Sequence, residues 1–253
     1  EPHALYTCSP SLLQDAKKIA DDYHLMLGIH LLENQSEGEQ LQDKFGKSAV
    51  SFLHDMDYLN DRLLAFHCVC MSREEMELFA KHNCKVSHNP ASNMKLASGI
   101  SPVPDMLKAG ITVGLGTDGC ASNNTLDMIR EMSTAAKLHK VARLDPTVMD
   151  AKTAVRMATI EGAKALNMDN ITGSLDVGKK ADIIIIGLNK PHLTPIYNEY
   201  SHLVYAAGGA DVDTVIINGR VVMENRHLLT INESDVMNEV REIAVKVKKS
   251  MKM

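Results

Sequence analysis

Short apolar segments alternate with amphipathic helical patterns through the first two thirds of the chain. The predicted strands are Leu25–Ile29, Leu63–Phe66, Cys84–Ser87 and Ile111–Leu115. The predicted helices are Ser9–Tyr23, Gln40–Leu53, Ser72–His82 (opened by a Ser72-Arg73-Glu74-Glu75 capping box), Val103–Lys108 and Leu126–His139. This alternation predicts a parallel sheet with helices outside it. The strand segments are almost continuously apolar, which is typical of strands buried on both faces.

The pattern changes after Pro146. The predicted elements there are helices Thr147–Met157 and Glu161–Leu166, a turn-rich segment Gly173–Asp182, strands Ile183–Gly187, Thr214–Ile217 and Arg220–Glu224, and a charged helix Glu233–Lys249. Asn218-Gly219 between two β-branched runs predicts a hairpin. We therefore expect a β/α domain over residues 1–170, a small β unit over 171–231 and a C-terminal helix over 232–253.

Charge and cysteine content exclude several classes of protein. The chain has 27 basic and 32 acidic residues, a net charge of −5, and no basic run that would attract nucleic acid or anionic lipid. No apolar run approaches the ~20 residues of a membrane span. The 5 cysteines are odd in number and form no Cys-x-x-Cys pair, which indicates a reduced, cytoplasmic protein. Neither nucleic acid nor a membrane is expected as a partner.

Polar side chains follow each of the four predicted strands of the β/α segment. His30, His67 and His88 follow the first three strands, and Asp118 lies shortly after the fourth. His3 precedes a helix as though it too followed a strand. In β/α barrels these strand ends carry the working residues. One histidine or Asp-Gly pair is ordinarily a loop residue, but four consecutive strands ending this way indicate a Zn²⁺ site that activates water.

Five strings of residues resemble the motifs of one known family, and they occur in the family's order. They are Pro2-His3-Ala4-Leu5-Tyr6-Thr7-Cys8-Ser9, His30-Leu31-Leu32-Glu33, His67-Cys68-Val69, Ser87-His88-Asn89-Pro90-Ala91-Ser92-Asn93-Met94-Lys95-Leu96 and Gly116-Thr117-Asp118-Gly119-Cys120-Ala121-Ser122-Asn123-Asn124. On these strings the chain resembles the amidohydrolase superfamily, in its branch of 5′-methylthioadenosine, S-adenosylhomocysteine and 5′-deoxyadenosine deaminases and their chlorohydrolase-like relatives. The resemblance covers essentially the whole chain. It implies an α/β fold: the C-terminal half of a (β/α)8 TIM barrel, part of a small β-sandwich domain and a terminal helix.

The resemblance also implies roles for individual residues in a hydrolytic deamination. His30 and Asp118 would be ligands of zinc or another divalent metal, and Asp118 would also move protons. His67 would hydrogen-bond the attacking water or the tetrahedral intermediate. Glu33 would bind the substrate and protonate the purine ring nitrogen. This chemistry is consistent, because a metal lowers the pKa of water from 15.7 to about 7 and a neutral purine needs ring protonation as hydroxide adds.

The remaining motif residues have simpler expected roles. His3 and Ser122 would contact the nucleoside, which is the expected small-molecule partner. Ser92 and Asn93 belong to the same motif but fit equally a structural role in shaping their loop. The other histidines are expected to be surface or packing residues: His24, His54, His82, His139, His192, His202 and His227.

The His-x-His pair of the family's first strand does not occur in the 253 residues. Counting strands back from Asp118 as the eighth places His3 at the end of the fourth. We therefore expect the C-terminal part of a longer enzyme, inactive or nearly so alone, whose partner is the N-terminal part of the same protein. A homo-oligomer is a further expectation. Two alternatives stay open: an amidohydrolase acting on guanine, cytosine or a triazine, and a non-catalytic half-barrel that serves in binding or assembly.

Overall fold

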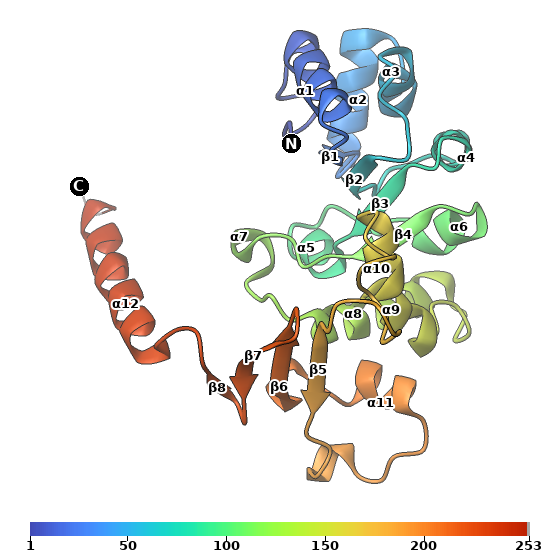
Figure 1. The fold of residues 1–253 in the computed structure, drawn as a ribbon. Coiled ribbons are helices and arrows are strands. Elements are labelled where there is room, and N and C mark those ends of the chain that lie inside the picture. Colours follow the sequence, from blue (N-terminus) through green and yellow to red (C-terminus); the bar gives the residue numbers. More distant parts are fainter. Residues whose placement is uncertain (252–253) are drawn as a thin grey trace.

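A four-stranded parallel sheet organises the first part of the chain in the computed structural model, which describes residues 1–251 (Figure 1). Its strands are β1 (Leu27–Leu31), β2 (Leu63–His67), β3 (Lys85–His88) and β4 (Thr112–Leu115), paired in that order. Ala4 adds an isolated parallel bridge to His30, beside the free edge of β1. The predicted parallel order is confirmed, and the chain returns to the same end of the sheet after every strand.

Helices connect the strands and cover one face of this sheet. They are α1 (Pro10–Asp22), α2 (Gln35–Phe45), α3 (Ala49–Asp55), α4 (Arg73–Lys81), α5 (Pro90–Lys95), α6 (Val103–Lys108), α7 (Cys120–Asn123) and α8 (Met128–Arg143). The α4 capping box forms as predicted, with Ser72 and Glu75 each accepting from the other's backbone N–H. Helix α6 has the predicted bounds, and Gly110 follows it with φ +86°.

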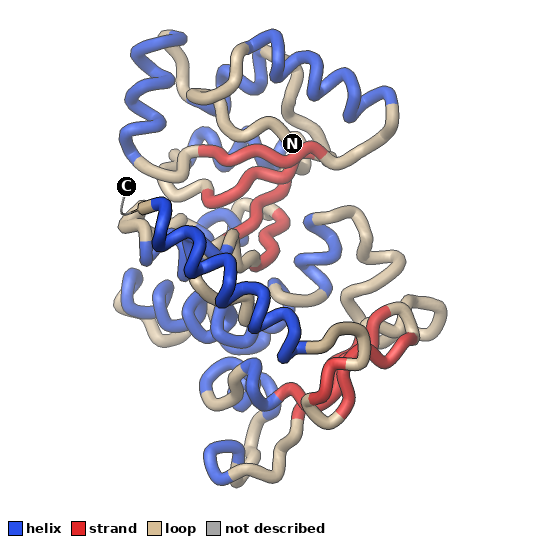
Figure 2. Tube along the Cα trace, turned by 90° about the vertical axis from the view of Figure 1, so that its left-hand side faces the viewer, coloured by secondary structure: helices blue, strands red, loops and turns tan. Residues whose placement is uncertain are grey.

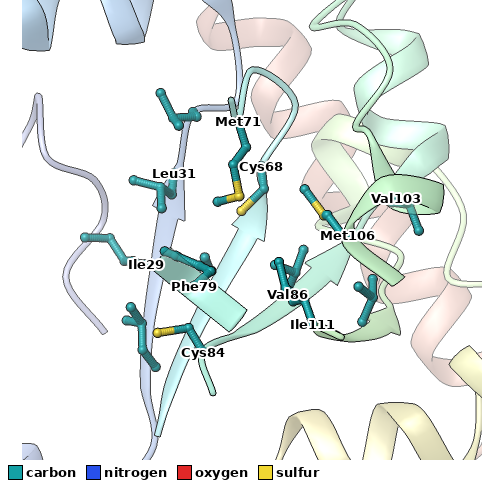
Figure 3. Packing of buried hydrophobic residues seen from close by; sticks show 14 of the residues in the cluster. Ile29, Leu31, Cys68, Met71, Phe79, Cys84, Val86, Val103, Met106 and Ile111 are labelled. Carbon is teal, nitrogen blue, oxygen red and sulfur yellow. The ribbon is translucent and has the colours of Figure 1, made fainter. Parts of the chain in front are cut away.

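The hydrophobic core lies between the sheet and these helices. Ile29, Leu31 and Val86 are fully buried on one face of the sheet, where Phe79 of α4 and Met106 of α6 pack near them (Figure 3). Each fully buried side chain of this size stabilises the fold by about 1.5–3 kcal/mol relative to exposure. This half of the fold therefore has a substantial core of its own.

The opposite face of the sheet is only partly covered, which corrects the expectation of strands buried on both faces. Side-chain burial alternates along β1, and Gly28 and His30 are half-buried between fully buried neighbours. Phe66 of β2 and Ser87 of β3 are likewise half-buried. Within residues 1–251 no layer of secondary structure closes this face over β1.

Several predicted boundaries differ from the structure, among them both ends of α8 and the starts of α9 (Ala151–Met157) and β6 (Val212–Ile217). Two further differences have clear local reasons. Strand β1 begins two residues later than predicted and runs through His30, which therefore lies within the strand. The predicted helix Gln40–Leu53 is two helices, because Gly46 takes a left-handed conformation (φ +66°) that ends α2, and Ser48 then caps α3.

A second sheet follows and is antiparallel. Two helices lead to it, α9 (Ala151–Met157) and α10 (Ile160–Ala165), and its strands are β5 (Ile183–Ile186), β6 (Val212–Ile217), β7 (Arg220–Glu224) and β8 (His227–Leu228), paired in sequence order. Figure 2 shows the two sheets as separate groups of strands. Asn218 and Gly219 form the predicted hairpin turn, both with positive φ.

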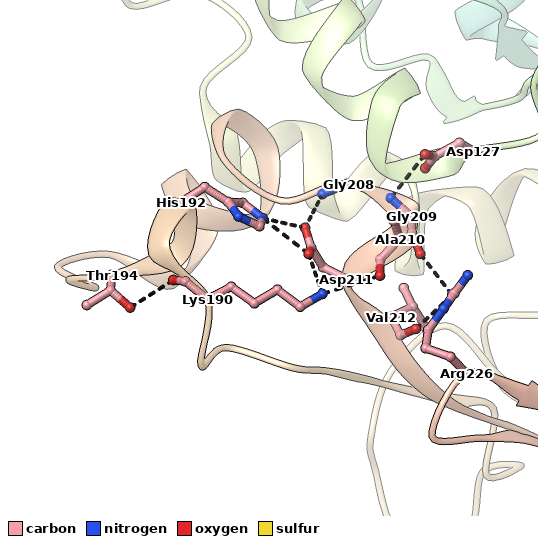
Figure 4. A network of polar contacts seen from close by, with 10 residues as sticks. All are labelled: Asp127, Lys190, His192, Thr194, Gly208, Gly209, Ala210, Asp211, Val212 and Arg226. Atoms are coloured by element: carbon pink, nitrogen blue, oxygen red, sulfur yellow. Dashed lines mark hydrogen bonds and ion pairs between the residues drawn. The ribbon is translucent and has the colours of Figure 1, made fainter.

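The connection from β5 to β6 contains a helix that the sequence pattern did not predict, α11 (Glu199–Tyr205). Asp211 anchors this connection, because its buried carboxylate accepts from Lys190 Nζ at 2.7 Å, His192 Nε2 at 3.0 Å and the Gly208 N–H at 2.9 Å (Figure 4). These partners, Lys190 first, hold the pKa of Asp211 well below its usual range. The loop is thereby fixed to the start of β6.

The C-terminal helix, α12 (Glu233–Ser250), stands apart from the rest of the structure in Figure 1. None of its side chains is buried, although Val236, Val240, Ile243 and Val247 recur at helical spacing. Among residues 1–251, no helix combines the length and the apolar composition that crossing a membrane requires.

Candidate functional site

Three side chains from neighbouring strands converge at the C-terminal end of the parallel sheet. His30 lies near the end of β1, His67 ends β2, and Asp118 follows β4 by three residues. Their candidate ligand atoms all lie within 4.8 Å of one another. The rings of His30 and His67 are stacked, with centroids 5.5 Å apart. This arrangement matches the ligand types and the crowding that a small divalent cation requires.

Strained backbone accompanies two of the three residues. His67 has φ +70° and Asp118 has φ +59°, a left-handed conformation that costs non-glycine residues on the order of 1–3 kcal/mol. Such residues persist where surrounding contacts fix them, and they concentrate at functional sites. The conformation turns the chain sharply at the strand end and directs both side chains to the same place.

Hydrogen bonds fix the proton positions on both histidines. His30 Nδ1 lies 2.9 Å from the backbone carbonyl of His3, and His67 Nδ1 lies 2.8 Å from Asn93 Oδ1. Each of these oxygens can only accept, so Nδ1 carries the proton and donates it. In the neutral ring the other nitrogen, Nε2, then keeps a free lone pair, which is the state that a metal or a water hydrogen can bind.

The Asp118 carboxylate is held in its charged form. Burial alone would raise the pKa of Asp118, but hydrogen bonds to the carboxylate outweigh it and lower the pKa below its usual value. The donors are Ser92 Oγ and Ser122 Oγ, at 2.6 and 2.7 Å from Oδ2, and the Gly119 N–H, at 2.8 Å from Oδ1. The site thus presents two imidazoles and one carboxylate, a donor set that fits Zn²⁺.

The other three predicted site residues are His3, Ser122 and Glu33, and they differ in how closely they contact this cluster. The ring of the exposed His3 lies beside the His30 ring, with centroids 4.8 Å apart, and Ser122 donates a hydrogen bond to Asp118. Glu33 is half-buried just after β1, and its carboxylate receives one long hydrogen bond, from Ser98 Oγ at 3.5 Å. The structure therefore brings five predicted residues together and leaves the Glu33 carboxylate available for another partner.

His88, the fourth polar strand end, does not join the cluster. It is fully buried, and its Nε2 lies 3.1 Å from Nε2 of the buried His139. Burial drives the pKa of His88 well below its usual value and lowers that of His139 to about 4. The low pKa values make both rings neutral near pH 7, so the two residues form a buried, neutral pair between β3 and α8.

Sequence reasoning gave too little weight to the residues that orient the site. Ser92 and Asn93, both fully buried in α5, bond directly to Asp118 and His67. Glu37, which no motif singles out, is buried on α2, accepts the Glu33 N–H at 2.8 Å and has a pKa raised by burial. The signal for Ser92 and Asn93 was their place in a recognisable string; for Glu37 it was the spacing of four residues from Glu33.

Known proteins are similar to this chain in both sequence and fold. An amidohydrolase family model matches residues 1–222. The chain is 60% identical to a 5-methylthioadenosine/S-adenosylhomocysteine deaminase of Syntrophus aciditrophicus (strain SB), over 100% of this chain and 57% of the relative. It is 47% identical to a 5′-deoxyadenosine deaminase of Methanosarcina acetivorans, over 96% of this chain and 56% of the relative.

A solved structure gives the same result for the fold. A zinc-bound adenosine deaminase from Xanthomonas campestris superposes with a TM-score of 0.96 at 34% identity, over 98% of this chain and 56% of that chain. The chain thus spans somewhat more than half the length of these relatives. Since the family model covers most of the sequence, including every residue of the cluster, the chain belongs to the amidohydrolase family.

Proposed function

We propose that this chain is the part of a zinc-dependent nucleoside deaminase that carries His30, His67 and Asp118. The reaction is hydrolytic removal of the amino group of an adenosine-type nucleoside, such as methylthioadenosine, S-adenosylhomocysteine, 5′-deoxyadenosine or adenosine, with release of ammonia. The observation that carries the proposal is the convergence of two histidines with free Nε2 atoms on a charged carboxylate. The names of the relatives support the substrate class.

His30 Nε2 and the Asp118 carboxylate are the groups that would hold the metal. When bound, zinc supplies hydroxide at neutral pH by lowering the pKa of water to about 7. Asp118, kept ionised by Ser92 and Ser122, accepts the proton that water loses and returns it to the departing amino group. The Nδ1–H group of His67 donates to Asn93, and Nε2 of the same ring accepts a hydrogen bond from the attacking water.

Glu33 is the acid that would give its proton to the purine ring nitrogen as hydroxide adds to the neighbouring carbon, and it would regain a proton from the hydroxyl group of the adduct as ammonia leaves. Its carboxylate has the one weak internal partner described above, so it can bond the purine without first losing a strong contact. Ring protonation by a positioned acid contributes about 10²–10⁴-fold to the rate. Ser122 donates to Asp118 and still has lone pairs for the nucleoside, and the exposed His3 offers it an aromatic face.

The partly covered face of the first sheet supports a half-barrel. We assign β1 to β4 as strands five to eight of a (β/α)8 barrel, within a domain of residues 1–170, followed by part of a small β domain (171–231) and a terminal helix (232–253). The rest of the barrel would come from a segment matching the remaining length of the relatives, with its His-x-His pair completing the metal site. The five free cysteines fit the reduced cytoplasm.

The proposal can be tested by supplying the part that the chain does not span. Residues 1–253 are co-expressed with the part of the Syntrophus aciditrophicus deaminase that the chain does not match, and the purified pair is called the complemented protein below. Ammonia release is measured on a panel of adenosine nucleosides, guanine, cytosine and a triazine. We expect release from the nucleosides alone and its loss in His30→Ala. A zinc-loaded complemented protein that releases ammonia from none of the nucleosides would contradict the proposal.

A further inference from the structure

A buried carboxylate outside the cluster contacts the two chain segments that orient the cluster residues. Glu131 is in the first turn of α8, with 1% of its surface exposed. Its Oε1 accepts from Asn123 Nδ2 at 2.7 Å, and its Oε2 accepts from the Ala91 backbone N–H at 3.2 Å. Each oxygen therefore holds a different segment of the chain.

The first of these segments is α5, which supports two cluster residues at once. Ser92 donates to Asp118, and Asn93 accepts from His67. The residue that precedes α5, Asn89, makes no side-chain capping hydrogen bond, so the first N–H groups of this short helix need another acceptor. Glu131 provides that acceptor at Ala91 and so fixes the start of α5.

The second segment runs from Thr117 to Asn123, includes α7 and carries Asp118 and Ser122. Asn123 Nδ2 donates to Glu131 and also to the backbone carbonyl of Thr117, at 2.6 Å, directly before Asp118. Lys95 of α5 donates to the carbonyl of Ala121 at 2.7 Å, which ties the two segments together on their other side. The left-handed backbone at Asp118 is held within this network.

We propose that Glu131 is a positioning residue for the site: by accepting from Asn123 and Ala91 together, it sets the place of Asp118 relative to His67. The inference rests on the proposed function only for the identity of the ion. Its contacts need a carboxylate, because both partners are donors. An amide in the same place turns an N–H toward one of them, whichever way it is rotated.

The test compares Glu131→Gln with Glu75→Gln in the complemented protein. Glu75 in α4 is a matched control, since it is also a buried carboxylate and accepts the Ser72 and Val50 N–H groups, neither of which belongs to the cluster. Two quantities are measured: the tautomer of His67 in metal-free protein, by ¹⁵N NMR with ¹⁵N-histidine in the chain, and zinc affinity, by competition with a chelator. Neither depends on turnover.

We expect Glu131→Gln to convert His67 from a single Nδ1–H tautomer to a mixture, and to weaken zinc binding about 10- to 100-fold, the scale for residues that orient ligands. Glu75→Gln should lower Tm and leave both quantities unchanged. A stable Glu131→Gln protein with the wild-type tautomer and zinc affinity would overturn the proposal. If the wild type binds no zinc, the proposed function fails, and the tautomer alone decides the role of Glu131.

A second variant keeps the proposal testable if Glu131→Gln does not fold. Asn123→Ala changes a half-buried side chain. It removes the two bonds by which Asn123 links Glu131 to the Thr117 carbonyl and leaves the contact of Glu131 to Ala91. Zinc affinity should fall about 10-fold, the lower end of that scale, with the His67 tautomer unchanged. Wild-type zinc affinity in Asn123→Ala would contradict the role assigned to Glu131.

Discussion

Single residues at this site work in states that their neighbours impose. An acceptor oxygen beside each Nδ1 keeps the proton of His30 and His67 on that nitrogen, so that Nε2 of the neutral ring is free, and three donors favour the charged form of Asp118. The identity of these residues could be predicted from the sequence, since they lie in recognisable strings. Their tautomers and the supporting role of Asn93 could not, because they depend on contacts between residues that lie 26 and 27 positions apart.

Glu33 and His30 should have separable roles although they are three residues apart. In the complemented protein we expect Glu33→Gln to keep the wild-type zinc content and to lower kcat by about 10²–10⁴-fold, the usual scale of general acid catalysis. His30→Ala should lose the metal itself. Zinc content is measured by mass spectrometry and kcat by ammonia release. Near-normal turnover in Glu33→Gln would show that Glu33 is not the proton donor.

The buried His88–His139 pair should make stability depend on acid. Burial, and to a smaller extent Arg143, lowers the pKa of His139 from 6.5 to about 4, so the folded state favours the neutral ring. Such a group contributes stability that is present above pH ~6.5 and is lost as the pH falls toward 4. The loss is on the order of 2–3 kcal/mol for a shift of this size.

This pH dependence can be measured by urea unfolding of the complemented protein between pH 7 and 4. His139→Gln retains a hydrogen-bonding side chain and does not titrate, so its unfolding free energy should change less over this range than that of the wild type. Parallel pH profiles for the two proteins would contradict the assignment of a neutral His139.

Elements with strong local signals were the ones that the sequence predicted well. The α4 capping box, the bounds of α6 and the Asn218-Gly219 turn each follow from chemistry within a few residues. The break between α2 and α3 was missed because it depends on one left-handed glycine. Helix α11 was missed because it lies in a long connection and packs against α8 and α9, which are distant in the sequence. Helical periodicity alone does not distinguish one bent segment from two helices.

Replacement by alanine should have opposite effects on stability at Gly38, inside α2, and at Gly46, directly after it. Gly46→Ala places a side chain on left-handed backbone (φ +66°) and should destabilise the protein by about 1–2 kcal/mol. Gly38→Ala lies inside the helix, where the added Cβ meets Leu32 Cδ2 at 3.5 Å, an ordinary contact, and should stabilise it by about 0.4–1 kcal/mol. Urea unfolding of the complemented protein measures both. Stabilisation by Gly46→Ala would contradict the left-handed cap.

The whole molecule exposes apolar surface in places that a self-contained enzyme would cover. Ile184 and Ile185 on the edge strand β5 are 52% and 50% exposed, and the apolar positions of α12 are similarly open. From the strand count and the absent His-x-His pair, the sequence predicts only a part of a longer enzyme. It could not predict which surfaces would be open, because that depends on how the second sheet and α12 are placed.

Residues 1–253 alone should therefore associate or be poorly soluble, since open strand edges and apolar helix faces pair with other chains. Co-expression with the complementary part should give a defined complex in which the backbone amides of β5 and α12 are protected from hydrogen exchange. Light scattering coupled to size exclusion and exchange mass spectrometry measure the two effects. A stable, cooperatively unfolding monomer of residues 1–253 would contradict the half-barrel assignment.

Zinc titration into the metal-free complemented protein, followed by ammonia release from 5′-methylthioadenosine, tests the central claim most directly. If His30 and Asp118 hold the catalytic ion, activity should rise in proportion to added zinc and reach a plateau at about one equivalent, the stoichiometry of a single catalytic site. The same titration of His30→Ala should give no activity at that ratio. Deamination that is independent of zinc, or an unchanged titration curve in His30→Ala, would contradict the account.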